Sequence, residues 1–313
     1  MDAKGRDARS PWAMPWAGWK SVLWRSWNES SDDNIGLIAA GVAFYGFLAL
    51  VPLLGAVVLC YGLVAAPETV LHDVRALSTV LPRDIAAVVG DQLLGLVHRP
   101  DGEKGLGILI ALGIALFGAR NGAGAVIAAL NIAYEEKEKR NFLWVNLTAL
   151  AITLGAVLAA VLAAGAMTAL GALDRLLPFA PDVLLVLGGI ASHVLLTLAG
   201  AAGAAALYRF GPSRAQPRWT WITPGSLFAA ALWLGLTLGF GAYVRYVGRF
   251  DATYGALGAI VALLTWLYLS AYVLMFGAEL NSELEHQTAH DTTTGPPVPP
   301  GQRHAWVADN IAE

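Results

Sequence analysis

Residues 252–278 form a run of 27 residues that contains no charged side chain. At about 1.5 Å per helical residue, this run reaches roughly 40 Å, which exceeds the roughly 30 Å hydrocarbon core of a bilayer. Inside lipid an unpaired backbone amide costs several kcal/mol, so a segment of this length must be helical. The run therefore predicts a transmembrane helix and restricts the chain to folds that are built in a membrane.

Five further segments have the same character, and only one of them holds a charge, Arg120. Hydrophobic residues make up 57% and charged residues 14% of the 313 residues, a composition that excludes a water-soluble globule. The fold class is therefore predicted as all-α: a polytopic membrane helix bundle occupying residues 34–285. We expect six transmembrane helices, at about residues 35–64, 105–134, 142–170, 183–208, 223–244 and 255–280.

Residues 1–33 are predicted to be a cytoplasmic N-terminal segment with an amphipathic interfacial helix. Five of its large apolar side chains repeat at helical spacing: Trp12, Trp16, Trp19, Leu23 and Trp27. Indole rings favour the headgroup level of a bilayer, so this helix is expected to lie on the inner leaflet. The alternative is that the rings pack against cytoplasmic loops.

Two other extramembrane segments flank the predicted spans. Apolar residues repeat at helical spacing on both sides of Pro82 within residues 66–104, which predicts two short amphipathic helices between the first and second spans. Residues 286–313 are polar and rich in proline and threonine, so they are predicted to be a disordered cytoplasmic tail.

The distribution of positive charge predicts the orientation. With an even number of spans both termini share a side, and placing them in the cytoplasm puts twelve Lys and Arg residues there against seven outside. The net charge of −3 gives no basic field, so nucleic acid is not expected as a partner. Membrane lipids are the expected partners, and a homo-oligomer is possible.

Arg120 is the sharpest candidate for function, because a charge at membrane depth costs several kcal/mol unless it faces a partner or water. On a helix it shares a small, polar stripe with Gly113, Gly124, Asn131 and Glu135. This stripe is expected either to line a substrate path, with Arg120 and Asn131 in it, or to hold helices together.

The sixth predicted span supplies the other candidates for a substrate path: Tyr268, Tyr272 and Glu279, which share one helical face. Glu279 is expected near the inner boundary, where an ion pair with Arg120 or with a nearby lysine or arginine is conceivable. Just beyond it, Glu283, His286 and His290 have helical spacing and are weak candidates for metal ligands. We otherwise predict no metal and no cofactor.

Small residues indicate close helix packing. The spacings Gly118-x-x-x-Gly122 and Gly235-x-x-x-Gly239 would allow two helix backbones to approach each other.

An enzyme is not expected. The sequence has no Gly-x-Ser-x-Gly, no His-Glu-x-x-His and no Gly-x-x-x-x-Gly-Lys-Ser/Thr motif. No catalytic residue is therefore assigned.

Three motifs resemble one family, the YihY or virulence factor BrkB family of bacterial inner-membrane proteins. The motifs are Ala39-Ala40-Gly41-Val42-Ala43-Phe44-Tyr45 leading to Pro52-Leu53, Trp221-Ile222-Thr223-Pro224-Gly225, and Tyr254-Gly255-Ala256-Leu257-Gly258 followed by Gly277-Ala278-Glu279-Leu280-Asn281. The resemblance covers roughly residues 20–285. It implies six membrane helices, both termini in the cytoplasm and an unsettled activity.

Members of this family often carry a ribonuclease label. A zinc-dependent ribonuclease needs a His-x-His-x-Asp-His type of cluster, and the sequence has none, so we do not expect this activity. The two remaining hypotheses are a transporter-like protein for an amphipathic or anionic envelope compound, and a membrane scaffold or assembly factor without transport.

Overall fold

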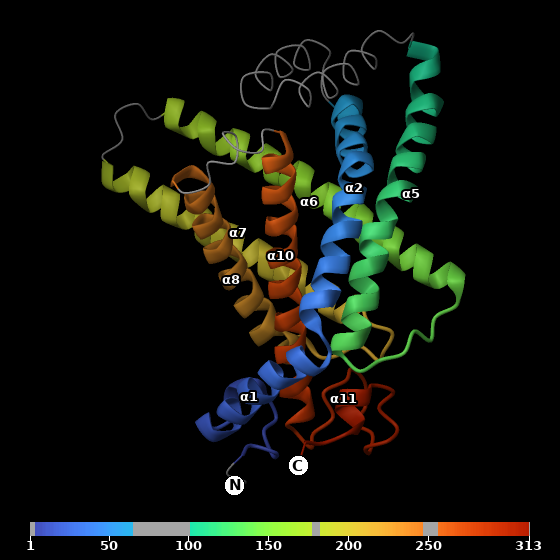
Figure 1. Ribbon diagram of the computed structural model, residues 1–313, viewed down its shortest axis with the longest axis vertical. Helices are drawn as coiled ribbons and strands as arrows, with labels where there is room; N and C mark the ends of the chain where they lie inside the picture. The colour runs from blue at the N-terminus through green and yellow to red at the C-terminus, as the bar shows by residue number, and fades with distance from the viewer. Residues whose placement is uncertain (1–3, 65–100, 177–181, 247–255, 313) are drawn as a thin grey trace. The chain divides into compact units, whose positions relative to one another are not determined.

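The long uncharged runs form long helices in the computed structural model, which describes residues 4–64, 101–176, 182–246 and 256–312. The elements in chain order are η1 (Pro11–Ala13), α1 (Trp16–Asp32), α2 (Ile35–Val64), α5 (Asp101–Ala133), α6 (Phe142–Leu176), α7 (Asp182–Phe210), α8 (Trp219–Tyr246), α10 (Ala256–His286) and α11 (Trp306–Asp309), as shown in Figure 1. The described residues contain no strand, only an isolated bridge between Pro217 and Thr293. The all-α class is confirmed.

Four described helices are long and apolar enough to cross a membrane: Leu112–Ala133, Phe142–Ala159, Trp219–Tyr243 and Ile260–His286. A fifth span results if α1 and the start of α2, which meet at a bend of 65°, are counted as one broken span. The chain is therefore a helical membrane protein with four to five apolar helices among its described residues, and six spans stay a prediction. The short helices expected within residues 66–104 fall on 65–100, outside the described residues.

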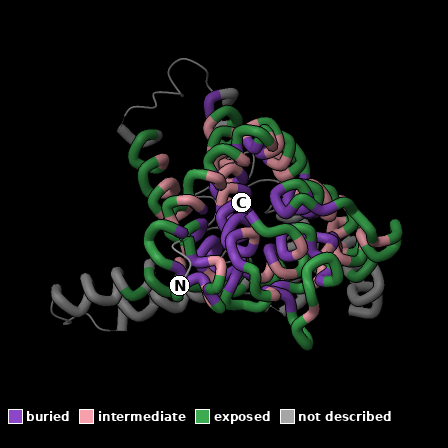
Figure 2. The backbone as a smooth tube through the Cα atoms, turned by 90° about the horizontal axis from the view of Figure 1, so that it is seen from below, coloured by how far each residue is buried: buried purple, intermediate pink, exposed green. Residues whose placement is uncertain are grey.

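Apolar side chains cover the outer sides of these helices. Leu37, Ile114, Phe142, Leu162 and Leu195 are all more than half exposed, and Figure 2 shows exposed residues along the outer sides of the helices. A surface of this kind in water would be an aggregation hazard, and in a bilayer it is the ordinary contact with lipid.

Contact clustering divides the chain into two units. The first unit comprises Met1–Tyr45, Gly124–Val145 and Pro181–Glu313, and the second comprises Gly46–Ala123 and Asn146–Ala180. In the first unit α8 packs against both α7 and α10, and α1 packs against α10.

A close approach of two helices in the first unit joins α8 to α10 at Gly225 and Gly277. A Cβ atom added at Gly225 would run into the carbonyl oxygen of Gly277 and the side chain of Asn281. These residues belong to two of the motifs quoted above, so the motifs serve, at least in part, to bring two backbones into contact.

The glycines of Gly235-x-x-x-Gly239 are not at a close helix contact of the kind that Gly225 makes. A Cβ atom added at either position would meet nothing within 4 Å, so neither is a point of close approach among the described residues. Spacing alone does not identify a helix contact, because it leaves open which face of the helix meets a neighbour. Gly118 does approach another helix, since its added Cβ atom would lie 3.2 Å from Cβ of Pro52 within the second unit.

Helix α1 presents two different faces. Gly18, Val22, Ser26 and Ser30, spaced four residues apart, are buried, as expected for the side that packs against α10. Four of the N-terminal tryptophans, Trp12, Trp16, Trp24 and Trp27, are more than half exposed, whereas Trp19 packs against a buried cluster. Free indole rings favour the interfacial interpretation over packing against loops, and the interfacial location itself stays a prediction.

The C-terminal segment differs from the expected disordered tail, because it packs against the N-terminal segment and against the connections between helices. Arg303, 4% exposed, donates hydrogen bonds to the backbone oxygens of Ala308 at 2.6 Å and Ala289 at 2.8 Å. The hydroxyl of Thr288 donates to the backbone oxygen of Ala8 at 2.7 Å. Proline has no backbone N–H group, and this segment has no regular element that would pair its carbonyl oxygens. The buried guanidinium group of Arg303 supplies donors for two of these oxygens.

Four chain segments thus meet at one end of the first unit: residues 4–34, the connection 134–141, the connection 211–218 and residues 287–312. We call this the polar end. Cross-links between its segments include the backbone bond from Ala215 to His304 at 3.0 Å and the bond from the Trp306 amide to Glu136 at 2.7 Å.

Candidate functional site

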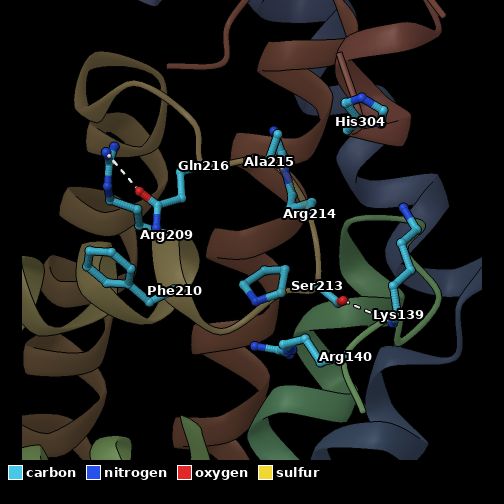
Figure 3. Close-up of a pocket in the computed structure, with 10 residues that line it drawn as sticks. Lys139, Arg140, Arg209, Phe210, Ser213, Arg214, Ala215, Gln216 and His304 are labelled. Carbon is cyan, nitrogen blue, oxygen red and sulfur yellow. Dashed lines mark hydrogen bonds between the residues drawn. The ribbon is translucent and has the colours of Figure 1, made fainter. Parts of the chain in front are cut away.

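A basic pocket of about 470 Å³ lies at the polar end, where the connection after α5 meets the connection between α7 and α8. Its charged and polar lining residues are Lys139, Arg140, Arg209, Ser213, Arg214, Gln216 and His304, which Figure 3 shows around the opening. The volume suits a small polar group. No acidic side chain is among the lining residues.

Three of the four pocket cations are already matched by carboxylates. Lys139 pairs with Glu136 at 2.7 Å, Arg140 with Glu138 at 2.8 Å, and Arg214 with Glu285 at 2.6 Å. The hydrogen bonds from Arg140 lower the pKa of Glu138 to about 2, so this carboxylate stays ionised near neutral pH.

Arg209 has no carboxylate partner among the described residues. Its guanidinium group donates to the backbone oxygen of Pro217 and, at 3.3 Å, to the side-chain oxygen of Gln216, and its Nε atom is buried without a partner there. The same group lies 4.6 Å from the ring centroid of Trp219. Arg209 therefore contributes the unneutralised positive charge of the pocket, and it does so beside an aromatic surface.

The aromatic surface next to Arg209 is accessible. Phe210 and Trp219 stack edge to face, with ring centroids 6.2 Å apart, and both side chains are about half exposed. A cation adjoining exposed aromatic rings is the arrangement that suits a molecule with an anionic head and an apolar body.

Arg214, which lines the pocket, pairs with Glu285, and both side chains are 0% exposed. Arg214 also lies 4.9 Å from the ring centroid of Tyr134, and Glu285 accepts a further hydrogen bond from Thr292 at 2.6 Å. A buried pair of this kind links α10 to the 211–218 connection in a single geometry, because either charge alone would be costly at this depth.

Asn131 lies at the end of α5, beneath the pocket, and it is buried. Its side-chain oxygen accepts from the Ser213 amide at 2.7 Å and its amide group donates to Glu138 at 3.0 Å. The structure thus engages Asn131 in holding together the two connections that form the pocket. Its predicted place in a substrate path stays a prediction.

Arg120, the sharpest candidate from the sequence, belongs to the second unit. It donates to the side-chain oxygen of Asn146 at 2.5 Å and lies 4.3 Å from the ring centroid of Phe117. Both polar partners are on membrane helices, α5 and α6, so the hydrogen bond satisfies part of the guanidinium group in the bilayer. The ion pair with Glu279 that the sequence leaves open joins two different units and stays a prediction.

The candidates on α10 all lie in the first unit. Tyr268 and Tyr272 are partly buried, with ring centroids 6.4 Å apart, and Tyr272 packs against the apolar core. Glu279 is 2% exposed, and its carboxyl group interacts electrostatically with that of Asp33. The partner of Glu279 in this unit is thus an acid.

The weak metal candidates past α10 have other partners. Glu283 pairs with Arg25, His286 Nδ1 lies 3.5 Å from Glu283, and the amide of His290 bonds the Thr288 hydroxyl. In the described part of the chain these three residues do not form a group with metal-ligand spacing, whereas Glu29, Asp33 and Glu135 do.

The sequence indicated Arg209 and Arg214 only as positive charges and Lys139 and Arg140 only as charges and as conceivable partners of Glu279, so it did not predict a site formed by these four residues. The available signal was that these positive residues cluster in or directly beside two short connections that the predicted topology places on one side. Their convergence in one pocket depends on the packing of α7 against α8 and of the C-terminal segment, which spacing does not reveal.

The comparisons with known proteins agree on the family that this chain resembles. The family described as Virulence factor BrkB matches residues 26–301. Similar curated proteins include the ribonuclease-like protein YfkH of Bacillus subtilis, 29% identical over 255 residues that cover 79% of this chain and 88% of that protein. A UPF0761 membrane protein of Pseudoalteromonas translucida is 26% identical over 272 residues, covering 85% of this chain and 86% of that protein. No solved structure matches.

Proposed function

Because the chain belongs to the virulence factor BrkB family of membrane proteins, we propose that it is a transporter-like protein of the bacterial cytoplasmic membrane that takes an anionic amphipathic compound. The proposal includes six spans, with both termini in the cytoplasm. Arg209 in the basic pocket is the observation that carries it. An envelope lipid with a phosphate head is the class of substrate that fits best.

The first support is charge. Arg209 offers a guanidinium group without a carboxylate partner among the described residues, and Lys139 and Arg140 line the same pocket. Guanidinium groups bind phosphate and carboxylate through two parallel hydrogen bonds, which makes arginine the usual choice for such anions.

The second support is the location of the pocket at the ends of membrane helices. The connections 134–141 and 211–218 and both chain termini meet at the polar end, as expected if an even number of spans separates the termini. The exposed rings of Phe210 and Trp219 adjoin the pocket, so a headgroup bound there keeps its apolar chains beside the membrane.

A scaffold or assembly factor is the alternative, and one observation favours it. Asn131 and Asn281 both bond backbone groups of other segments, and Arg120 bonds Asn146, which is what a purely structural role for polar residues requires. A scaffold predicts a stoichiometric partner on purification and no lipid movement by the chain alone. We propose no ribonuclease activity for either case, since the sequence lacks the zinc-ligand cluster for it.

The test is lipid movement in proteoliposomes that contain the full chain. Fluorescent phosphatidylglycerol is the anionic probe and fluorescent phosphatidylcholine the neutral one, and dithionite bleaches whatever reaches the outer leaflet. We expect the chain to speed movement of phosphatidylglycerol more than that of phosphatidylcholine. Arg209→Gln removes charge-assisted hydrogen bonds and should slow the anionic probe by about tenfold or more.

Lys137→Gln is the control for loss of a positive charge, because Lys137 lies in the 134–141 connection beside the pocket residues Lys139 and Arg140, is exposed and does not line the pocket. It should transport like the parent chain. Size-exclusion profiles and melting temperatures establish that the variants are folded. Movement of both probes in the proteoliposomes that is no faster than in protein-free vesicles, or an unaffected Arg209→Gln, would overturn the proposal and favour the scaffold.

A further inference from the structure

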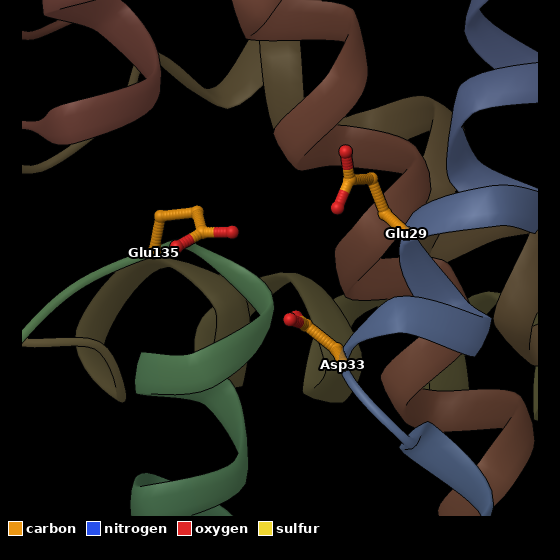
Figure 4. A group of neighbouring side chains, drawn as sticks. All are labelled: Glu29, Asp33 and Glu135. Atoms are coloured by element: carbon orange, nitrogen blue, oxygen red, sulfur yellow. The ribbon is translucent and has the colours of Figure 1, made fainter.

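Three carboxylates converge at the polar end, away from the basic pocket. Glu29 lies in the last turn of α1, Asp33 directly follows that helix, and Glu135 follows α5. One ligand oxygen from each lies within 4.8 Å of those of the other two, and Figure 4 shows the side chains directed toward one another. Glu29 and Asp33 share a helical face because they are four residues apart.

Among the described residues, no lysine or arginine pairs with these carboxylates. In the described part of the chain none of the three forms an ion pair, and Arg25, one turn before Glu29, is bonded to Glu283 and to Gln287 at 2.7 Å. Burial and the charge of Glu135 raise the pKa of Asp33 to about 6, and burial also raises the pKa of Glu29. Unmatched like charges at this distance oppose folding unless something neutralises them.

A fourth carboxylate gives an independent indication of a ligand. Glu279, on α10, interacts electrostatically with Asp33 and Glu29 of the cluster, and only 2% of its surface is exposed. Its Oε1 atom has no hydrogen-bond partner among the described residues. Buried carboxylate oxygens without partners are rare, because each costs about 1–3 kcal/mol or more.

The spacing and the donor atoms fit a hard metal ion. Oxygens that share one Ca²⁺ ion sit about 2.3–2.6 Å from it, so they lie within about 5 Å of one another. An all-oxygen set favours Ca²⁺, Mn²⁺ or Mg²⁺ over Zn²⁺, which prefers nitrogen and sulfur ligands. Mg²⁺ demands shorter distances and near-ideal octahedral geometry, so it fits an open arrangement of three residues less well.

We propose that Glu29, Asp33, Glu135 and Glu279 form a binding site for a hard divalent cation of the Ca²⁺ or Mn²⁺ class, which ties α1 to α10 and to the end of α5. All four residues belong to the first unit. The site uses none of the residues of the basic pocket, so it stands whether or not the chain transports a lipid.

Mn²⁺ is the probe, because its electron paramagnetic resonance signal reports binding directly. The full chain is placed in nanodiscs of zwitterionic lipid, which bind little metal themselves. We expect about one Mn²⁺ per chain, displaced by Ca²⁺. Asp33→Asn and Glu279→Gln should each weaken Mn²⁺ binding by about tenfold or more, as loss of groups at metal sites commonly does.

Asp32→Asn is the matched control: it makes the same chemical change at an exposed neighbour that is not part of the cluster, and it should bind like the parent chain. Glu135→Gln, at an exposed residue, replaces the other variants if these do not fold. Ca²⁺ should also raise the melting temperature of the parent and of Asp32→Asn but not of Asp33→Asn.

Two results would overturn the site. One is Mn²⁺ binding no greater than that of empty nanodiscs, or equal binding by the Asp33→Asn and parent chains. The other is a melting temperature of the parent chain that Ca²⁺ leaves unchanged at neutral pH, in which case the carboxylates hold no cation.

Discussion

The side-chain oxygen of Asn281 accepts a 2.8 Å hydrogen bond from the backbone amide of Gly225, across the contact between α10 and α8. The amide group of Asn281 donates in turn to the backbone oxygen of Ile222 at 3.1 Å. Pro224 lies within α8, and a proline inside a helix disturbs the backbone hydrogen bonds around it. Asn281 thus bonds one backbone group on each side of Pro224, and in a membrane such side-chain partners from a neighbouring helix help to satisfy backbone groups near a proline.

Asn281→Leu keeps the approximate volume and removes both hydrogen bonds. We expect it to cost about 1–3 kcal/mol of stability, because a buried amide and a buried carbonyl lose their partner. The melting temperature in detergent measures this. Asn28→Leu, the same change at an exposed position of α1, is the control and should alter the melting temperature little.

Gly225→Ala should also destabilise the chain, by about 1–3 kcal/mol, because the new methyl group would push against the Gly277 backbone and Asn281. Gly235→Ala, on the same helix, has open space at the added atom and should be neutral or slightly stabilising. Equal melting temperatures for the two variants would contradict the close contact of α8 with α10.

Glu285→Gln leaves Arg214 buried without its opposite charge. We expect a loss of about 3–5 kcal/mol, the usual effect of breaking a buried pair. The double variant Arg214→Met with Glu285→Leu removes both charges and should be less destabilised than the single variant. A double variant that is at least as unstable as Glu285→Gln would show that the pair contributes more than mutual neutralisation.

Arg120→Ala tests the sharpest candidate from the sequence. If Arg120 acts in the substrate path, the variant stays folded and loses lipid movement in proteoliposomes. Asn146→Ala removes the observed partner of Arg120 and leaves the charge in place, so it should retain more activity. If Arg120 only joins helices, both variants lower the melting temperature and neither changes transport per folded molecule.

Asp33 predicts a pH dependence of stability. Its pKa is raised from 3.8 to about 6, so the folded chain binds a proton more tightly than the unfolded chain does. Its contribution is fully present below about pH 4 and is lost as the pH rises through about 6. In the presence of a chelator the melting temperature should fall over this interval, and Asp33→Asn should flatten the fall. The same slope in Asp33→Asn would assign the effect to another group.

The amino-acid sequence alone determined the fold class of this protein, an all-helical membrane protein. Charge-free runs longer than the thickness of a bilayer predict helices, because each backbone amide in lipid must find its partner within its own segment. This prediction does not depend on which segments pack beside it. The structure begins α2 at Ile35, and the bounds of the six predicted spans stay predictions. The predicted tail shows the limit of such reasoning, since its packing depends on contacts of Arg303 and Thr288 with distant backbone groups.

Only the tertiary structure decided which polar residues meet. Arg214 and Glu285 are 71 positions apart, and Asn281 is 56 positions from Gly225, so neither relationship follows from helical periodicity. Glu135 joins Glu29 and Asp33 only because the ends of α5 and α1 lie together at the polar end. A polar group in a membrane protein is satisfied by whichever segment packs beside it, and that neighbour is a property of the whole bundle.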